Sequence, residues 1–422
     1  MKSKAPSWIL SFLLGRALDC RNIILFKKGY YKMHLVSERM NRVMPSATSA
    51  VLNLAAQLRE EGKDIISLGA GEPDFDTPTH IKEAAIKAIK DGKTKYTAID
   101  GTAELKLAIQ KKFQRDNHLN YSHDEIIVSS GAKQTLFNLC MGLLDTGDEA
   151  IIPSPYWVSY PDMVRVAGGT PKIIQTGIEN DFKITTEQLK QSITKSTKLL
   201  FLNSPSNPTG SCYSKNELIE LGKILIKHPN IIVAADDIYE KIHWGKSRFY
   251  NIATAVPNIK NNVVTINGVS KCYAMTGWRI GYAGGPKQII KSMKTIQSQS
   301  TSNPCSISQI AALEALNGDQ SCVDIMNSEY KKRNEFLVSA LNNTPGFECR
   351  KGEGAFYAFP KVTDAIKNNN LNNDIELTDL ILKKAGVVLV PGTPFGSPGY
   401  IRLSFACSMD ELESAINRIS SI

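Results

Sequence analysis

Residues 268–282 read GVSKCYAMTGWRIGY and carry two cations, Lys271 and Arg279, with no acidic residue between them. Glycine and serine residues surround both cations, so the backbone there can approach a ligand closely. Two positive charges without a partner inside the segment indicate that an anion from outside the chain binds here. The segment therefore predicts a site for a small dianionic group.

Apolar runs with the length of strands lie on both sides of this segment, from about residue 125 onward. The seven runs are EIIVSSG (125–131), DEAIIPSPY (148–156), PKIIQTG (171–177), TKLLFLNSP (197–205), NIIVAADDIY (230–239), NVVTINGVS (262–270) and IGYAGG (280–285). Helical patterns such as residues 133–144 and 214–228 separate several of them. Val- and Ile-rich runs of this kind are typical of a sheet with helices on both faces. We therefore expect an α/β fold with a mostly parallel seven-stranded sheet that binds ligands at the carboxyl ends of its strands.

The last hundred residues follow a different pattern. Three strand-like runs surround an asparagine-rich loop, and a closing helix is predicted after Ser408 because Glu411, three residues later, completes a capping box. The runs are GEGAFYAFP (352–360), GVVLVPGTPFG (386–396) and YIRLSFA (400–406). The predicted division is a large domain of residues 71–309, a smaller α+β domain of residues 33–70 and 310–422, and an N-terminal extension of residues 1–32.

The formal net charge of +9 is unevenly distributed. Residues 1–32 contain seven Lys or Arg residues and one acid, so this segment carries +6 and the other residues carry +3. A nucleic-acid binder would show a basic stripe on its folded part. The six histidines do not form a metal-binding motif, and no window of about 18 apolar residues occurs. We therefore expect no nucleic-acid partner, no metal site and no membrane partner.

Two interpretations of residues 1–32 stay open. The uncharged run between Lys4 and Arg16 is 11 residues long, near the lower bound of a signal-peptide core, and no A-x-A-like cleavage site follows. The alternative to a weak signal or transit segment is an upstream start codon, with a functional protein that begins at Met33. The eight scattered cysteines are typical of reduced thiols, so we expect a cytoplasmic protein.

The common phosphate-binding loops are absent from the sequence. GAGEPD (69–74) has Asp74 where a dinucleotide fingerprint needs its third glycine, and no G-x-x-x-x-G-K-[ST] motif occurs. A different chemistry fits residues 268–282: a lysine among small residues can form a Schiff base with an aldehyde cofactor, and an arginine can grip its phosphate with two nitrogens.

On these residues the chain resembles the class I, fold-type I aminotransferases, which depend on pyridoxal 5'-phosphate (PLP). The attachment pattern of that family runs from Gly268 to Gly281, and the resemblance extends from about Met33 to the C-terminus. The stretches AGEPDFDTP, SGAKQ and PYWVSYPDM are most similar to the subgroup of bacterial aspartate and aspartate/prephenate aminotransferases. The resemblance implies a large PLP-binding domain, a smaller domain and a homodimer with shared active sites.

The resemblance also assigns residues to the cofactor ring. Lys271 would carry the cofactor and shuttle a proton, and Asp236 would pair with the pyridine nitrogen; without the resemblance, Asp236 could equally cap a helix. Tyr239 and Asn207 would hydrogen-bond the phenolic oxygen of the ring, where a core tyrosine and a turn asparagine are the alternatives. Trp157 would pack over the ring, or else be a plain core aromatic residue.

The cofactor phosphate has its own set of residues in the resemblance. Gly131 and Ala132 would offer backbone N–H groups at the start of a helix, where anions are favoured. Ser270 would add its hydroxyl and Arg279 its guanidinium. Tyr96 would reach the phosphate from a neighbouring subunit.

In the resemblance, the substrate contacts come from three further positions, together with Trp157 and Asn207. Arg402 would bind the α-carboxylate through a bidentate contact, although a structural salt bridge on a strand is the alternative. Gly71 would bring the backbone against the substrate, or form a simple turn. Lys133 would meet the distal carboxylate of aspartate or glutamate, or lie on a helix surface. Members that accept prephenate usually have a lysine just before the PSAT segment, where this chain has Met44.

Together these residues predict a ping-pong transaminase that uses amino-acid and 2-oxoacid substrates. The expected reaction is transfer from L-aspartate to 2-oxoglutarate, with weak transfer to prephenate. The alternatives are a prephenate, aromatic or kynurenine aminotransferase, or another fold-type I PLP enzyme such as a lyase. A PLP-binding transcription regulator would need a DNA-binding domain, which residues 1–32 are too short to provide.

Overall fold

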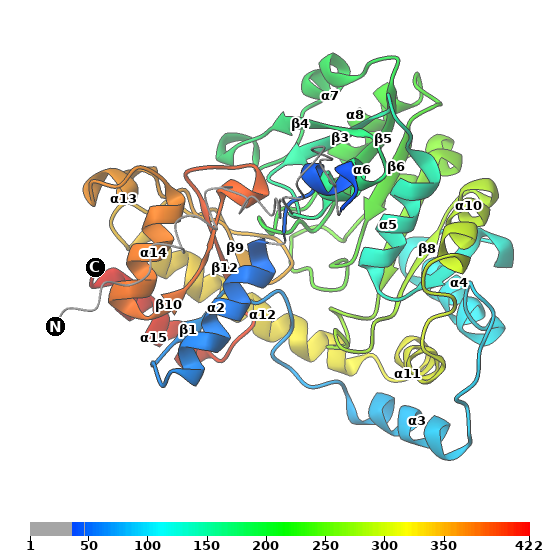
Figure 1. Cartoon of the computed structure of the whole chain (residues 1–422), viewed down its shortest axis with the longest axis horizontal. Helices are drawn as coiled ribbons and strands as arrows, with labels where there is room; N and C mark the ends of the chain where they lie inside the picture. Colours follow the sequence, from blue (N-terminus) through cyan, green and yellow to red (C-terminus); the bar gives the residue numbers. More distant parts are fainter. Residues whose placement is uncertain (1–35, 46) are drawn as a thin grey trace, which may run out of the picture.

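The computed structural model describes residues 36–45 and 47–422. The predicted N-terminal extension, residues 1–32, lies outside this part of the chain. The largest element is a seven-stranded sheet with the order β2-β8-β7-β6-β5-β3-β4 (Figure 1). The strands are β2 (Ile126–Ser129), β3 (Glu149–Ser154), β4 (Thr170–Gln175), β5 (Thr197–Asn203), β6 (Ile232–Asp236), β7 (Val263–Gly268) and β8 (Gly281–Gly284). β8 runs in the opposite direction to the other six strands, which are parallel to one another, so the predicted fold class is confirmed.

Both faces of this sheet are buried, which explains why its strands are continuous apolar runs. Along β5, Leu199 and Phe201 join the core on one face, whereas Leu200 and Leu202 join the core on the other. The helices around the sheet are α3 (Thr79–Lys90), α4 (Ala103–Asn117), α5 (Ala132–Leu143), α6 (Tyr160–Val166), α7 (Thr186–Ser192), α8 (Lys215–Leu225), α9 (Ile252–Ala255), α10 (Lys287–Ser298) and α11 (Ser306–Asn317). Residues of α5, α6 and α10 cover one face, and residues of α4, α8 and α11 cover the other.

A second core lies beside the large sheet. Its sheets are β1-β10, a parallel pair, and β11-β12-β9, which is antiparallel. These strands are β1 (Ile66–Ser67), β9 (Tyr357–Ala358), β10 (Val387–Val388), β11 (Val390–Pro391) and β12 (Ile401–Ser404). The helices are α2 (Ala47–Glu60), α12 (Ser321–Asn342), α13 (Thr363–Asn368), α14 (Asp374–Ala385) and α15 (Met409–Ser420). The predicted capping box of α15 is present, because Ser408 and Glu411 bond reciprocally.

The predicted division into two domains stays a prediction. The boundary at residues 309–310 falls inside α11, and this helix packs against α3 and α4 of the large-sheet part.

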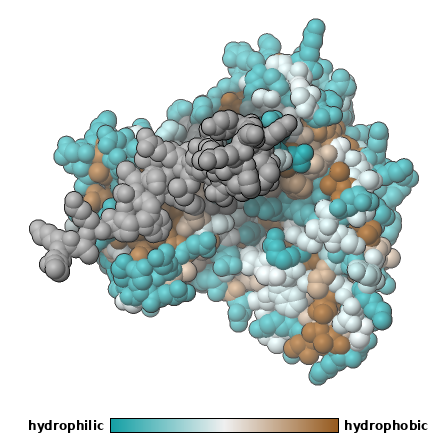
Figure 2. All heavy atoms as spheres, viewed as in Figure 1, coloured by the Kyte–Doolittle hydropathy of each residue, from teal (hydrophilic) through white to brown (hydrophobic). Residues whose placement is uncertain are grey.

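The outer face of α3 exposes Ile86 and Ile89, and Figure 2 shows a brown apolar patch where Figure 1 places α3. Exposed apolar patches are typical of surfaces that contact other proteins.

Within the described ranges, no helix is both long and apolar enough to cross a membrane. Over the same residues, His, Cys, Asp and Glu side chains form no cluster suited to a metal ion.

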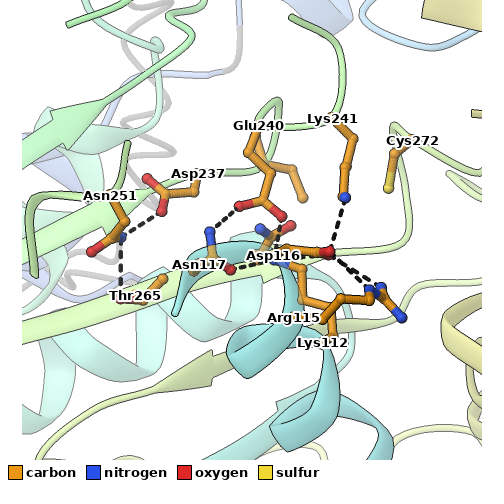
Figure 3. A network of polar contacts seen from close by, with 12 residues as sticks. Lys112, Arg115, Asp116, Asn117, Asp237, Glu240, Lys241, Asn251, Thr265 and Cys272 are labelled. Atoms are coloured by element: carbon orange, nitrogen blue, oxygen red, sulfur yellow. Dashed lines mark hydrogen bonds and ion pairs between the residues drawn. The ribbon is translucent and has the colours of Figure 1, made fainter. Parts of the chain in front are cut away.

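A buried polar network fixes the loop that follows β6 (Figure 3). Lys112 of α4 forms an ion pair with Glu240, and both side chains are about 4% exposed. Asn117 donates to Glu240 at 2.6 Å and accepts from Lys112 at 2.7 Å. Asp237, earlier in the loop, accepts a 2.5 Å bond from Asn251. The network therefore anchors the residues that come directly after Asp236.

Replacing Lys112 with methionine should destabilise the protein, because it leaves Glu240 as an uncompensated buried charge. The expected loss in the free energy of unfolding is about 3–5 kcal/mol, measured by urea unfolding of the cofactor-free protein. Lys223→Met is the control, since Lys223 pairs with Glu220 on the surface and should change stability by less than about 1 kcal/mol. Equal effects of the two substitutions would show that the buried pair has no special role.

Candidate active site

A cavity of about 350 Å³ lies at the carboxyl ends of the large-sheet strands, facing Tyr357 of β9 and Arg402 of β12. Most of the residues singled out in the sequence line this cavity. They are Gly71, Ala132, Lys133, Trp157, Asn207, Asp236, Tyr239, Ser270, Lys271, Arg279 and Arg402. Gly131 lies just outside the lining, against Arg279. Tyr96 does not line the cavity, and its side chain is 91% exposed.

Lys271 stands in the turn that follows β7. Its Nζ donates a 2.6 Å hydrogen bond to the carbonyl oxygen of Gly71. Burial, together with the positive charge of Arg279, lowers the pKa of Lys271 to about 8. A lysine with this pKa is neutral in an appreciable fraction of molecules near pH 7, and a neutral amine is a nucleophile.

Arg279 and the start of α5 form a narrow cradle. A Cβ atom on Gly131 would lie 2.3 Å from Nη2 of Arg279, and a Cβ atom on Gly281 would lie 2.1 Å from the backbone nitrogen of Ala132. Gly131 also has φ +89°, which other residues rarely adopt. The close packing brings a guanidinium group to the N-terminus of a 12-residue helix, where unpaired N–H groups favour an anion. These residues fit a phosphate group.

Asp236 is the last residue of β6 and is 4% exposed. Its Oδ2 accepts a 2.5 Å hydrogen bond from the hydroxyl of Tyr160, and its Oδ1 accepts a 3.4 Å bond from the backbone of Ile238. Burial raises the pKa of Asp236 to about 6, although the Tyr160 bond opposes this rise. Tyr160 was missed in the sequence, although it lies only three residues after Trp157, whose carbonyl oxygen accepts a 3.0 Å bond from the backbone N–H of Tyr160.

Arg402 of β12 is 2% exposed and points into the cavity from the smaller sheet. Its Nη1 donates to Oδ1 of Asn207 at 3.0 Å, and its Nη2 donates to the carbonyl oxygen of Gly69 at 2.8 Å. Its Nε is buried and has no hydrogen-bond partner among the described residues. A buried unpaired donor is costly, so this atom fits an acceptor supplied by a ligand.

Lys133, the second residue of α5, extends over the cavity wall. Its Nζ lies 5.0 Å from the ring centroid of Trp157, within the range of a cation–π contact. Burial lowers the pKa of Lys133, and Arg279 contributes to the same effect. Lys133 therefore lines the cavity while remaining exposed to solvent, and its predicted contact with a distal carboxylate stays a prediction.

Tyr239 and Tyr357 meet across the cavity, with their hydroxyl oxygens 2.9 Å apart. Tyr357 was missed in the sequence, because nothing in GEGAFYAFP distinguishes it from a core aromatic residue. Thr48 and Ser49 of α2 also line the cavity. The predicted contact of Tyr96 with a neighbouring subunit stays a prediction.

Comparison with known proteins agrees with this geometry. The family model described as aminotransferase class I and II matches residues 63–419. The aspartate/prephenate aminotransferase of Nitrosomonas europaea is 55% identical over 393 residues, which cover 92% of this chain and 99% of the relative. The aspartate aminotransferase of Geobacillus stearothermophilus is 48% identical over 384 residues, which cover 91% of this chain and 98% of the relative.

Solved structures show the same fold. The aspartate aminotransferase of Rhizobium meliloti superposes with a TM-score of 0.88 at 45% identity and covers 92% of this chain and 98% of its own. The Thermus thermophilus aspartate aminotransferase with maleate gives a TM-score of 0.87 at 41% identity, covering 92% of this chain and all of its own. The matched family model spans most of the chain and includes every residue that lines the cavity except Thr48, Ser49 and Leu52. The chain belongs to the class I and II aminotransferase family.

Proposed function

We propose that this aminotransferase moves the amino group of L-aspartate to 2-oxoglutarate, giving oxaloacetate and L-glutamate, with PLP as its cofactor. The observation that carries the proposal is the convergence of three groups in one cavity: the amine of Lys271, the buried carboxyl of Asp236 and the unpaired Nε of Arg402. The names of the relatives from Nitrosomonas and Geobacillus support aspartate as the amino donor.

When bound, PLP supplies an aldehyde that condenses with an amine and a protonated ring that accepts the electron pair from the Cα of the substrate. The Arg279–α5 cradle and Ser270 fit its phosphate, while Asp236 fits its ring nitrogen. Asn207 and Tyr239 offer donors for its phenolic oxygen, and Trp157 offers an aromatic face. The carboxyl of Asp236 can stabilise a protonated ring nitrogen only when the carboxyl itself is ionised. With a pKa of about 6, Asp236 is mostly ionised at neutral pH.

Lys271 has two tasks in the proposed reaction. Its neutral amine would hold the cofactor covalently, and the amino group of the substrate would displace it as a free amine. The freed Nζ, held beside the cavity by the Gly71 carbonyl, would take the proton from the substrate Cα and deliver it to the carbon of the cofactor aldehyde, on the other side of the amino nitrogen. Hydrolysis by one water would release the oxoacid and leave the amino group on the cofactor, and a second oxoacid would reverse these steps.

The two carboxylates of aspartate have separate partners. Arg402 binds the α-carboxylate, since its guanidinium is fixed by Asn207 and Gly69 while Nε stays available. Lys133, which also lines the cavity, binds the distal carboxylate. Gly71 leaves room for close approach, since a Cβ atom there would lie 3.3 Å from the hydroxyl of Tyr357.

A homodimer with shared active sites belongs to the proposal. Tyr96 is 91% exposed in the single chain, which is unusual for an aromatic residue and is expected if a second copy covers it. The proposed location is the cytoplasm, which the free cysteines of the part of the chain that the structure describes support.

Transfer to prephenate is the second candidate function, because the relatives from Nitrosomonas europaea and Cereibacter sphaeroides carry both substrates in their names. Met44, 56% exposed, stands where prephenate-accepting members usually have a lysine. A methionine cannot bind a second carboxylate through charge, so we propose weak prephenate activity. The kcat/KM values for prephenate and 2-oxoglutarate, with aspartate as donor, measure which function dominates.

The first prediction is that the cofactor is attached to Lys271. Borohydride reduction and peptide mapping should find the pyridoxyl group on Lys271. Lys271→Ala should lower kcat by about 10²-fold to 10⁴-fold or more, because covalent attachment and proton transfer are lost together. Lys287→Ala, a surface control paired with Asp124, should keep normal turnover. A label on any other lysine would refute the assignment.

The second prediction concerns the charge of Asp236. An acid with a pKa of about 6 loses its charge as the pH falls through 6, so the affinity of the cofactor-free protein for PLP should fall between pH 7 and pH 5. Asp236→Asn should bind PLP roughly 10- to 150-fold more weakly at pH 8, because the substitution removes a charge-assisted hydrogen bond. The pH step seen in the wild type should be smaller in this variant. Unchanged affinity and an unchanged pH profile would leave Asp236 with a structural role only.

The third prediction concerns substrate choice. Lys133→Ala should lower kcat/KM for aspartate roughly 10- to 150-fold, because it removes a charge-assisted contact. The same substitution should have little effect on phenylalanine, which has no distal carboxylate. Lys215→Ala is the control, since Lys215 also lies over an aromatic ring, 5.5 Å from Tyr250, but does not line the cavity. Equal losses for aspartate and phenylalanine would exclude the distal-carboxylate role.

A further inference from the structure

Tyr357 of β9 has no part in the function proposed so far, yet it lines the cavity and is 1% exposed. Its ring and its hydroxyl make different contacts. The ring faces Arg402, and the hydroxyl faces Tyr239. One side chain therefore contacts a residue proposed for the substrate and a residue proposed for the cofactor.

The contact of the ring follows from strand register. Tyr357 pairs with Ser404 of β12, so Arg402, two residues away on the same face, is its diagonal neighbour. The guanidinium carbon of Arg402 lies 4.5 Å from the centroid of the Tyr357 ring and 5.1 Å from that of Phe395. Aromatic packing of this kind restricts the tilt of the guanidinium plane. It therefore helps to fix the direction in which the unpaired Nε points.

The contact of the hydroxyl joins the smaller sheet to the loop after β6. Among the residues that the structure describes, the hydroxyl of Tyr357 is hydrogen-bonded to the hydroxyl of Tyr239, at 2.9 Å. Only one proton lies between two bonded hydroxyl oxygens. When Tyr357 donates this proton, the proton of Tyr239 is free to point into the cavity. Burial raises the pKa of Tyr239, so Tyr239 stays protonated and able to donate.

We propose that Tyr357 is a positioning residue with two separable tasks. Its ring orients Arg402 for the substrate carboxylate, and its hydroxyl directs the proton of Tyr239 into the cavity. This inference rests on the proposed function, because it assumes that Arg402 binds a carboxylate and that Tyr239 faces the cofactor.

Two substitutions separate the tasks in the holoenzyme. Tyr357→Phe keeps the ring, so the Kd for maleate, a dicarboxylate without a reacting group, should stay within about 2-fold of the wild type, whereas kcat should fall roughly 2- to 10-fold. Tyr357→Leu removes the ring and should raise the Kd for maleate roughly 3- to 30-fold, the range of a desolvated cation–π contact. Tyr330→Phe and Tyr330→Leu are the controls, because Tyr330 packs on Phe356 in the same core and does not line the cavity.

A double-mutant cycle tests the hydroxyl contact independently of maleate. In a Tyr239→Phe background, Tyr357→Phe should change kcat by less than about 2-fold, because its partner is already gone. Full additivity of the two losses would overturn the hydroxyl task. Wild-type maleate affinity in Tyr357→Leu, or equal losses in the Tyr330 variants, would overturn the ring task.

The failure of this inference can be told apart from the failure of the proposed function. If wild type binds maleate, Arg402→Lys loses that binding and the Tyr357 variants behave like wild type, the proposed function stands and the positioning role is wrong. If the wild-type holoenzyme does not bind maleate, the dicarboxylate function is wrong, and the inference falls with it.

Discussion

The backbone of residues 69–71 holds the two cations on which the chemistry depends. Lys271, from the large sheet, donates to the carbonyl oxygen of Gly71, and Arg402, from the smaller sheet, donates to that of Gly69. The loop follows β1, which pairs with β10 of the smaller sheet. One short stretch of chain therefore sets the distance between the attachment lysine and the carboxylate-binding arginine. A shift of this loop would move both groups.

The charge balance of the cavity explains why anions belong there. Lys133, Lys271, Arg279 and Arg402 all line it, and Asp236 and Glu72 are the acids among the lining residues. Burial lowers the pKa values of Lys133, Lys271 and Arg402, and the positive charge of Arg279 also contributes for the two lysines. A phosphate and a dicarboxylate would compensate this excess. The same electrostatics that make the cavity bind anions keep the amine of Lys271 reactive.

The sequence was informative where chemistry and local pattern coincide. All seven strands of the large sheet appear as apolar runs, and Lys271 and Arg279 stand out because small residues surround uncompensated charges. Tyr160 and Tyr357 could not be identified in this way. Their importance comes from contacts with Asp236 and Arg402 that depend on how distant segments pack. The proposed site of Tyr96 lies on a second copy of the chain, which no single-chain geometry reveals.

The central claim is that Lys271 and Arg402 serve a two-stage amino transfer from a dicarboxylic amino acid. The most direct test is to mix the holoenzyme with L-aspartate alone and count the oxaloacetate released per active site. The account predicts one equivalent, after which the reaction stops until 2-oxoglutarate is added and one equivalent of glutamate appears. Continuous product formation without an oxoacid, or no oxaloacetate at all, would contradict it.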